Sequence, residues 1–268
     1  MNKTFSVAIF TDLDGSLLHR ETFKFDPIKD YIKSLINKGI ILIPNSSKTE
    51  KEIENFNKEL EIDLPYISEN GSSIHGLNLI NPNFPNKIIL SREKGELLEI
   101  FNSKVPEKLN DKCFFISSMK KKEQEKIFGQ RDEKLKDALD RKYTLPFLFK
   151  GDKNEKNRLL KIFNSNSLTL QDGGRISNLC DNVNKVKSMN RVVKILKKTV
   201  DKIKIIAVGD NYNDLDMLRN SDIPCLVFND QFKLDQININ NLIFSNKPSP
   251  EGWADVIKMA LVKLNYNG

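Results

Sequence analysis

Three short runs of apolar residues limit the folds available to this chain more than any other feature of its sequence. They are Val7–Phe10, Ile40–Ile43 and Ile203–Val208, and each run ends at polar or turn-forming residues. Strands that are apolar on both faces are typical of the interior of a parallel sheet, which helices cover on both sides. The runs therefore predict a parallel sheet and a fold of the α/β class.

Helix signals separate the first two runs and follow the second. Asp26-Pro27 places an N-cap and a first-turn proline before a helix that Gly39 ends. Overlapping capping boxes, Ser47-x-x-Glu50 and Thr49-x-x-Glu52, begin the next helix. Pro65–Ser68 is predicted as a third strand of the same sheet. This alternation, which returns near residue 180, predicts a doubly wound, Rossmann-like parallel-sheet core.

The middle of the chain lacks this alternation and predicts an inserted α+β cap domain. We expect the first part of the core at residues 1–80, the cap at 81–178 and the second part of the core at 179–268. The strands expected in the cap are Ile88–Leu90, Phe114–Ile116, Phe147–Phe149 and Leu168–Leu170, and the expected helices are Lys94–Phe101, Arg131–Leu139 and Glu155–Phe163.

The charge of the chain bears on its partners. Its 268 residues include 43 Lys and Arg against 36 Asp and Glu, which gives a net charge of +7. The basic residues are spread along the chain instead of forming one stripe, and the dense run Lys120-Lys121-Lys122 is predicted to be a solvated helix start. We therefore expect no nucleic-acid partner. A non-catalytic RNA-binding protein is kept as an alternative from a different functional class.

Membrane and export signals are absent from the sequence pattern. No apolar run approaches the ~20 residues of a membrane-spanning helix. The N-terminal apolar run leads directly into Asp12 and Asp14, which is unlike a signal peptide. Cys113, Cys180 and Cys225 are odd in number and widely spaced, as in reduced thiols. These features predict a cytoplasmic protein without a membrane partner.

Paired carboxylates follow two of the apolar strands. Asp12 and Asp14 come after the first run, and Asp210 and Asp214 come after the run that ends at Val208. In a parallel sheet, ligands bind beyond the carboxyl ends of the strands, so these loops are expected to meet. Clustered carboxylates repel one another unless a cation is present, and oxygen ligands of this kind suit Mg²⁺. The sequence therefore predicts a magnesium site.

A hydroxyl group and a lysine complete the chemistry. Ser46 follows the second apolar strand, and Lys185 comes just ahead of the helix that precedes the Asp210 strand. A carboxylate nucleophile, a hydroxyl, a lysine and a magnesium site fit phosphoryl transfer. We therefore expect a small anionic, phosphorylated substrate.

These residues resemble the four signature motifs of the haloacid-dehalogenase-like phosphatases. The position of the cap between the second and third motifs resembles the subclass that carries a large α+β cap. Further segments resemble the mannosyl-3-phosphoglycerate phosphatase family. The motifs are Asp12-Leu13-Asp14-Gly15-Ser16, Ser46, Lys185 and Gly209-Asp210-x-x-Asn213-Asp214, and the family segments are Pro44–Thr49, Glu69-Asn70-Gly71, Arg141-x-Tyr143-x-x-Pro146-Phe147, Gly173-Gly174-Arg175 and Pro250-Glu251-Gly252-Trp253.

The resemblance implies roles for the catalytic residues. Asp12 would attack phosphorus and form an aspartyl-phosphate. Asp14 would protonate the leaving oxygen and then deprotonate the hydrolytic water. Ser46 and Lys185 would hold the phosphoryl group. Because the expected glycine after the motif lysine is missing, Lys187 is a rival to Lys185.

The resemblance also implies how ligands are bound. One Mg²⁺ would be held by Asp12, the Asp14 carbonyl and Asp210, with Asp214 completing the shell directly or through water. Cap and rim residues would bind the substrate, and the two arginines among them suit a carboxylate. The implied substrate-binding residues are Ser47, Lys48, Arg141, Gly173, Gly174, Arg175 and Asn213.

The implied reaction is Mg²⁺-dependent hydrolysis of a glycosyl-3-phosphoglycerate, either mannosyl or glucosyl. Its products are phosphate and a glycosylglycerate that could serve as a compatible solute. Another sugar-phosphate phosphatase or a phosphomutase of the same superfamily is the alternative within enzymes. The sequence predicts neither the glycosyl group nor the oligomeric state.

Overall fold

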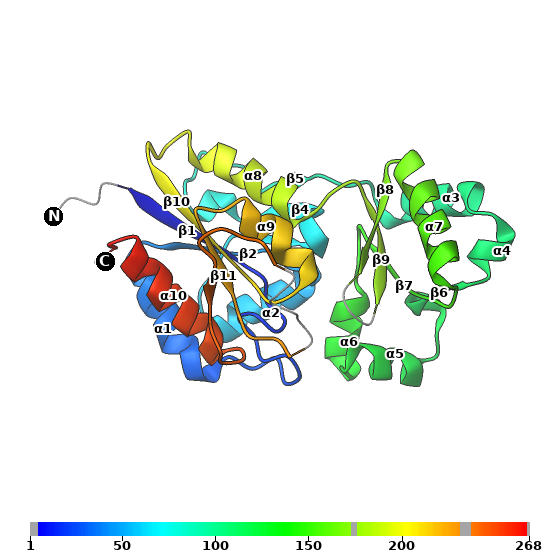
Figure 1. Ribbon diagram of the computed structural model, residues 1–268, viewed down its shortest axis with the longest axis horizontal. Helices are drawn as coiled ribbons and strands as arrows, with labels where there is room; N and C mark the ends of the chain where they lie inside the picture. The colour runs from blue at the N-terminus through cyan, green and yellow to red at the C-terminus, as the bar shows by residue number, and fades with distance from the viewer. Residues whose placement is uncertain (1–4, 173–175, 231–236, 267–268) are drawn as a thin grey trace.

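The computed structural model describes residues 5–172, 176–230 and 237–266. Figure 1 shows two units side by side, a larger one that contains both ends of the chain and a smaller one formed by its middle. Two crossings of the chain join the units. We call the larger unit the core and the smaller one the cap.

The core is built on a five-stranded sheet in which every neighbouring pair is parallel. The order is β12-β11-β10-β1-β2. The predicted doubly wound parallel sheet is therefore confirmed. Its strands are β1 (Ser6–Thr11), β2 (Ile41–Pro44), β10 (Ile203–Gly209), β11 (Ile223–Leu226) and β12 (Ile243–Phe244).

Helices cover both faces of this sheet because its interior strand β1 is apolar on both sides. Val7 and Ile9 pack with helices α1, α2 and α10, whereas Ala8 and Phe10 pack with α8 and α9. Alternate residues of a strand point to opposite faces, so one continuous apolar run supplies both layers. The helices are α1 (Lys29–Asn37), α2 (Glu50–Leu60), α8 (Lys185–Leu196), α9 (Leu215–Arg219) and α10 (Glu251–Lys263).

The prediction that Pro65–Ser68 forms a third strand of the parallel sheet is wrong. This strand, β3 (Tyr66–Ser68), forms only an isolated bridge beyond β2, between Asn45 and Ile67. It pairs antiparallel with β4 (Ser73–His75), which the sequence pattern did not predict. The tight turn at Glu69–Gly71 reverses the chain at once and favours the antiparallel neighbour. β5 (Lys87–Ile89), expected in the cap, also pairs with β4 and belongs to this small sheet.

The cap is a four-stranded antiparallel sheet in the order β6-β7-β9-β8, with α3, α4 and α7 packed on one face. Phe101, Leu159 and Phe163 of these helices form its hydrophobic core with the strand residues Phe147 and Leu179. The strands are β6 (Cys113–Phe115), β7 (Leu145–Phe149), β8 (Leu168–Asp172) and β9 (Ser177–Asp181), and the helices are α3 (Lys94–Lys104), α4 (Glu107–Asn110), α5 (Lys121–Phe128), α6 (Asp132–Leu139) and α7 (Lys153–Ser165).

Sheet membership suggests where the two units divide. β5 belongs with the core and β9 with the cap. At the two crossings, the Arg92 guanidinium binds both oxygens of Asp181, at 2.9 Å from Nε and 2.8 Å from Nη2. We propose that the cap spans residues 91–182 instead of 81–178.

Five 3₁₀ helices lie in the turns of the described chain, and two of them, η2 and η5, lie at the candidate site. They are η1 (Asp26–Ile28), η2 (Glu69–Gly71), η3 (Leu77–Leu79), η4 (Ile116–Ser118) and η5 (Tyr212–Asp214). Among the described residues, none of the helices is long and apolar enough to cross a membrane.

The strand order determines where the site lies. The chain continues from β1 to β2 on one side of β1, and the neighbour on the other side is β10. The strand order therefore reverses between β1 and β10. Ligands bind beyond the carboxyl ends of strands at such a switch point. The register pairs Thr11 with Val208, so Asp12 and Gly209-Asp210 leave the sheet side by side.

Gly252 and Gly95 provide a matched test of the packing. Both are the second residue of a helix, α10 and α3, respectively. A Cβ on Gly252 would lie 2.1 Å from the carbonyl oxygen of Lys247, whereas a Cβ on Gly95 would meet nothing within 4 Å. We expect Gly252→Ala to lower the free energy of unfolding by about 1–3 kcal/mol.

Gly95→Ala is the control, and it should raise the free energy of unfolding by up to about 1 kcal/mol because alanine favours the helix. Urea unfolding of both variants measures the two values. Equal stability of Gly252→Ala and wild type would contradict the close approach at Lys247.

Candidate active site

The two acidic loops meet at the switch point of the sheet. The Asp12 backbone N–H donates to Val208 O at 2.9 Å, which continues the pairing of β1 and β10 by one residue. Carboxylate oxygens of Asp12, Asp210 and Asp214 lie within 4.8 Å of one another. Their exposed fractions are 6%, 2% and 0%, so three acidic groups share one buried space. The predicted meeting of the loops is what the structure shows.

Lys185 is the buried cation of this space. Its Nζ lies 2.6 Å from Asp12 Oδ1 and 2.7 Å from Asp214 Oδ1. Burial lowers the pKa of Lys185, but the two carboxylates outweigh burial and raise it above its usual value. Lys187, the alternative lysine in the sequence, is exposed, and its Nζ donates to Asn182 O and Oδ1. The structure thus brings Lys185 to the carboxylates and leaves Lys187 outside.

Helix capping explains why Lys185 and not Lys187 points inward. Asn184 is the N-cap of α8, and its side chain accepts a hydrogen bond from Lys187 N at 2.8 Å. Lys185 is therefore the first residue of the helix, next to the strand ends. Asn45 donates from Nδ2 to Lys185 O at 2.9 Å and ties this helix start to the loop after β2.

Asp210 is held by three donors. Ser16 Oγ donates to its Oδ1 at 3.1 Å, and Asn229 Nδ2 to its Oδ2 at 3.1 Å. The Arg20 guanidinium also pairs with Oδ2. Burial and the charges of Asp214 and Asp12 raise the pKa of Asp210, although Arg20 and Ser16 work against this. Arg20 and Asn229 were not predicted, because neither lies in a motif that signals a site.

Asp214 is fixed by the backbone of its own loop. The N–H groups of Asp210 and Asn211 donate to Asp214 Oδ2 at 3.1 and 3.2 Å. Gly209 makes this possible, because a Cβ there would lie 2.3 Å from the Cβ of Asp214. Burial is the main cause of the raised pKa of Asp214, against the lowering effect of Lys185.

The donor set fits a divalent cation. Asp12, Asp210 and Asp214 bring three carboxylates into a buried space that contains one lysine and the tip of Arg20. Burial is the largest cause of the raised pKa values of Asp210 and Asp214, and the charges of the neighbouring carboxylates raise them further. A hard cation with oxygen ligands would balance them.

Asp14 faces away from this cluster, toward the cap. Lys48 Nζ lies 2.9 Å from Asp14 Oδ1 and 3.2 Å from Glu52 Oε1. Burial raises the pKa of Asp14, and the Lys48 charge offsets this only in part. The structure therefore places Lys48 against Asp14, and a carboxyl with a raised pKa is suited to donating a proton.

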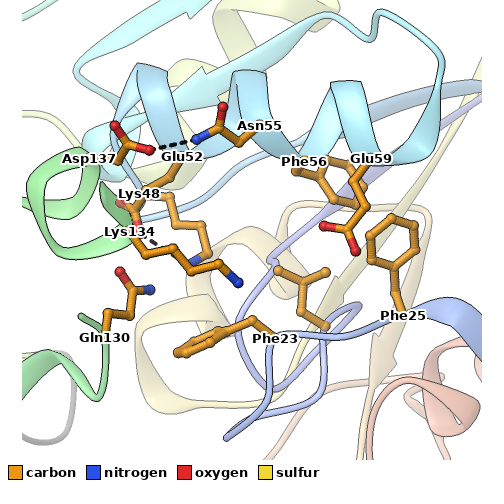
Figure 2. Close-up of a pocket in the computed structure, with 11 residues that line it drawn as sticks. Phe23, Phe25, Lys48, Glu52, Asn55, Phe56, Glu59, Gln130, Lys134 and Asp137 are labelled. Carbon is orange, nitrogen blue, oxygen red and sulfur yellow. Dashed lines mark hydrogen bonds and ion pairs between the residues drawn. The ribbon is translucent and has the colours of Figure 1, made fainter. Parts of the chain in front are cut away.

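A small pocket adjoins this lysine at the seam between core and cap. Figure 2 shows the aromatic rings of Phe23, Phe25 and Phe56 on its core side, with Gln130 and Lys134 reaching in from the cap. The Lys48 ammonium lies 4.7 Å from the Phe23 ring centre. Across the seam, Asn55 Nδ2 of α2 donates to Asp137 Oδ2 of α6 at 2.6 Å. The pocket measures about 90 Å³.

A larger cavity of about 400 Å³ lies between the core and the cap. Asp14, Ser47 and Lys48 line it from the core, and Arg141 lines it from the cap. Its volume falls in the range of about 300–1,000 Å³ that is usual for small-molecule sites. The cavity is therefore a candidate space for a substrate beside Asp14.

The cap sheet contributes polar groups to this cavity because of its alternation. Pro146 and Asn178 are paired across β7 and β9 and line the cavity, whereas their neighbours Phe147 and Leu179 lie in the cap core. Asn178 is 7% exposed, and its Oδ1 is buried without a hydrogen-bond partner among the described residues. Asn178 was not predicted as a site residue.

Arg141 is buried, with part of its guanidinium unused. It is 8% exposed, and its Nη1 donates to Ser47 O at 3.1 Å and to Thr144 Oγ1 at 3.0 Å. Its Nε is buried without a partner among the described residues. Buried polar groups are normally hydrogen-bonded, so this N–H is an unsatisfied donor on a residue that lines the cavity.

The remaining predicted residues are distributed as follows. Ser46 is fully buried beyond β2, where its Oγ accepts from Lys48 N at 3.3 Å. Asn213 is exposed in η5, whereas Asn211 lines the cavity. The predicted residues Gly173, Gly174 and Arg175 lie outside the described residues.

Comparisons with known proteins agree with this geometry. The chain matches the sequence model of the haloacid dehalogenase-like hydrolases over residues 9–247. It is 31% identical over 265 residues to a glucosyl-3-phosphoglycerate/mannosyl-3-phosphoglycerate phosphatase of Persephonella marina, which covers 94% of this chain and 96% of that protein. A mannosyl-3-phosphoglycerate phosphatase of Pyrococcus horikoshii is 29% identical, and the match covers 88% of this chain and 96% of that one.

The fold is shared with a solved phosphatase of the haloalkanoate superfamily from Bacteroides thetaiotaomicron. The TM-score is 0.71 at 14% identity, over 98% of this chain and 97% of that chain. The chain belongs to the haloacid dehalogenase-like hydrolases and, within them, to the family of the glucosyl-3-phosphoglycerate/mannosyl-3-phosphoglycerate phosphatases. The predicted family, fold class and hydrolase class are thus confirmed.

The acidic cluster predicts how stability depends on pH. The pKa of Asp210 is raised from 3.8 to about 8 by burial and by its carboxylate neighbours. Between these values the native state binds more protons than the unfolded chain, so its stability falls as the pH rises. In the presence of a chelator, we expect the free energy of unfolding to fall by about 1–3 kcal/mol from about pH 5 to about pH 8.

Asp210→Asn is the control for this experiment, because the amide does not titrate. Urea unfolding across the pH range should give a flatter profile for Asp210→Asn than for wild type. A wild-type stability that rises between about pH 5 and pH 8 would contradict the raised pKa.

Proposed function

We propose that the protein is a Mg²⁺-dependent phosphatase that hydrolyses a glycosyl-3-phosphoglycerate, mannosyl or glucosyl, to a glycosylglycerate and phosphate. The observation that carries this proposal is the buried Arg141, which lines the same cavity as Asp14 and whose Nε has no partner among the described residues. The two relatives named above, which are phosphatases of such substrates, support it. A glycosylglycerate product could serve as a compatible solute.

A carboxylate beside the phosphate explains the buried arginine. An arginine holds a carboxylate with two parallel N–H groups, which a neutral hydroxyl cannot match. The Arg141 Nη1 is already engaged by Ser47 O and Thr144, so the N–H groups of Nε and Nη2 are left for a ligand. Asn178 Oδ1, also without a partner, would accept a hydrogen bond from a glycosyl hydroxyl. Arg175 is a second candidate for the carboxylate.

The residues of the chain divide the reaction between them. Asp12 attacks phosphorus through its free oxygen while Lys185 holds the other one, and an aspartyl-phosphate forms as the ester bond breaks. Asp14 donates its proton to the departing glycerate oxygen and then takes a proton from the water that hydrolyses the aspartyl-phosphate. Lys48 keeps the Asp14 carboxyl facing the cavity. Ser46 and Lys185 bind the phosphoryl oxygens.

We propose Mg²⁺ as the cation, held by Asp12, the Asp14 carbonyl, Asp210 and Asp214. When bound, it neutralises the charge on the phosphoryl oxygens and so lets one anion attack another. Ser16 orients Asp210, and the loop backbone orients Asp214. The cytoplasmic location and the absence of a nucleic-acid partner stay predictions from the sequence.

Phosphate release from a panel of esters tests the proposed function. The panel contains mannosyl- and glucosyl-3-phosphoglycerate, hexose phosphates and p-nitrophenyl phosphate, each with Mg²⁺ or with a chelator. We expect a glycosyl-3-phosphoglycerate to give the highest kcat/KM, and activity to disappear with the chelator and return with Mg²⁺. Asp12→Asn should be inactive on all esters, because an amide does not attack phosphorus.

Two outcomes would contradict the proposal. Preference for a plain hexose phosphate would rule out the glycosyl-3-phosphoglycerate assignment, and full activity without metal would rule out the Mg²⁺ site. A requirement for a bisphosphate activator would favour a phosphomutase.

Arg141→Ala tests the recognition of the carboxylate. The loss of a charge-assisted hydrogen bond should lower kcat/KM on a glycosyl-3-phosphoglycerate by about ten- to a hundred-fold. The same variant should change the rate on p-nitrophenyl phosphate little, since this ester has no carboxylate. Equal losses on both esters would show that Arg141 does not select the carboxylate. Arg175→Ala, measured in parallel, tests the second candidate.

A further inference from the structure

The turn at Glu69-Asn70-Gly71 has no role in the reaction as described so far. Its three residues all have positive φ values, 45°, 60° and 99°. Such a conformation persists in non-glycine residues only where the surroundings enforce it, and it is often found at functional sites. A Cβ on Gly71 would lie 2.4 Å from Asn184 O, so the turn packs closely against the N-cap residue of helix α8.

The core side of the turn is fixed by the loop that follows β2. Glu69 N donates to Lys48 O at 2.8 Å, and Asn70 N donates to Ser46 O at 2.9 Å. The turn therefore has a rigid base in the core, next to the residues proposed to bind phosphate and to hold Asp14.

The side chain of Glu69 reaches across to the cap. It is fully buried, and its Oε1 accepts from Lys142 N at 2.8 Å. Its Oε2 accepts from Tyr143 N at 3.1 Å and from Thr144 Oγ1 at 2.6 Å. One core carboxylate thus binds three consecutive residues of the cap. Burying a carboxylate is unfavourable unless donors surround it, and here the cap supplies these donors.

Thr144 connects this contact to Arg141. An arginine only donates and a carboxylate only accepts, so the Thr144 hydroxyl accepts from Arg141 Nη1 and donates to Glu69. The hydroxyl can do both at once. The direction of the Arg141 guanidinium in the cavity is therefore determined by a series of hydrogen bonds that begins at a carboxylate of the core.

We propose that Glu69 is a positioning residue that sets the orientation of Arg141 in the substrate cavity through Thr144. The contact lies beside the crossings between the units, because Lys94 N donates to Lys142 O at 2.7 Å. The identity of the ligand that Arg141 binds rests on the proposed function. The hydrogen bonds from Glu69 through Thr144 to Arg141 do not depend on that function.

Kinetics of Glu69→Gln and Thr144→Val test this proposal. Glutamine keeps the shape but offers one acceptor oxygen, and its amide N–H₂ meets donors of the cap. We expect each variant to raise KM for the best ester of the panel by about ten-fold or more, with a much smaller change in kcat. Thr144→Ser keeps the hydroxyl and should restore the wild-type KM.

Lys142→Met is the matched control. It removes the 2.6 Å ion pair between Lys142 and Glu50, which also joins this cap segment to the core. It leaves the backbone N–H on Glu69 in place, so we expect wild-type kinetics. Hydrogen exchange at the amides of residues 142 and 143 should be faster in Glu69→Gln and unchanged in Lys142→Met.

A double-mutant cycle separates positioning from a merely structural role. If Glu69 acts through Arg141, Glu69→Gln combined with Arg141→Ala should be no worse than Arg141→Ala alone. Additive losses, or a Glu69→Gln variant with unchanged KM, would overturn the proposal. These outcomes are read on whichever ester the wild type prefers, so they are distinct from a failure of the glycosyl-3-phosphoglycerate assignment.

Discussion

The ion pairs of the buried Lys185 connect the parts of this site. Its ammonium bridges Asp12, which leaves β1, and Asp214, which lies in the loop after β10. These residues come from opposite ends of the chain and are separated by the whole cap. Removing one partner of a buried pair costs about 3–5 kcal/mol, because the other charge is left unbalanced. The loops, the start of α8 and the pairing of β1 with β10 therefore depend on one another.

The site combines two kinds of environment on either side of Asp12. Asp210 and Asp214 face a space rich in negative charge, where burial raises the pKa of both groups. Asp14 faces Lys48 and the cavity under the cap. Two carboxylates that are two residues apart on one loop thus lie in different surroundings. This difference fits the roles proposed above, in which metal binding and acid–base chemistry fall to neighbouring carboxylates.

The cap completes the site instead of only covering it. Its sheet places Asn178 at the cavity by strand alternation, and its 141–144 segment places Arg141 there, with Nη1 bound to Ser47 O and Thr144 Oγ1. On the core side, Glu69 accepts a hydrogen bond from the Lys142 backbone N–H, and Glu50 pairs with the Lys142 ammonium. Because Arg141, which is proposed to recognise the leaving part of a substrate, lies in a segment held by core carboxylates, the proposed substrate selection would depend on the position of the cap.

The sequence by itself determined the parallel core, the strand ends that carry Asp12 and Asp210, and the family, because apolar runs and acidic loops are local patterns. The tertiary structure alone decided between Lys185 and Lys187, since helix capping by Asn184 sets which lysine points inward. It also moved β3 out of the parallel sheet and joined Glu69 to Thr144, 75 residues further along the chain. Contacts between distant segments depend on how the units pack, and no local pattern encodes that packing.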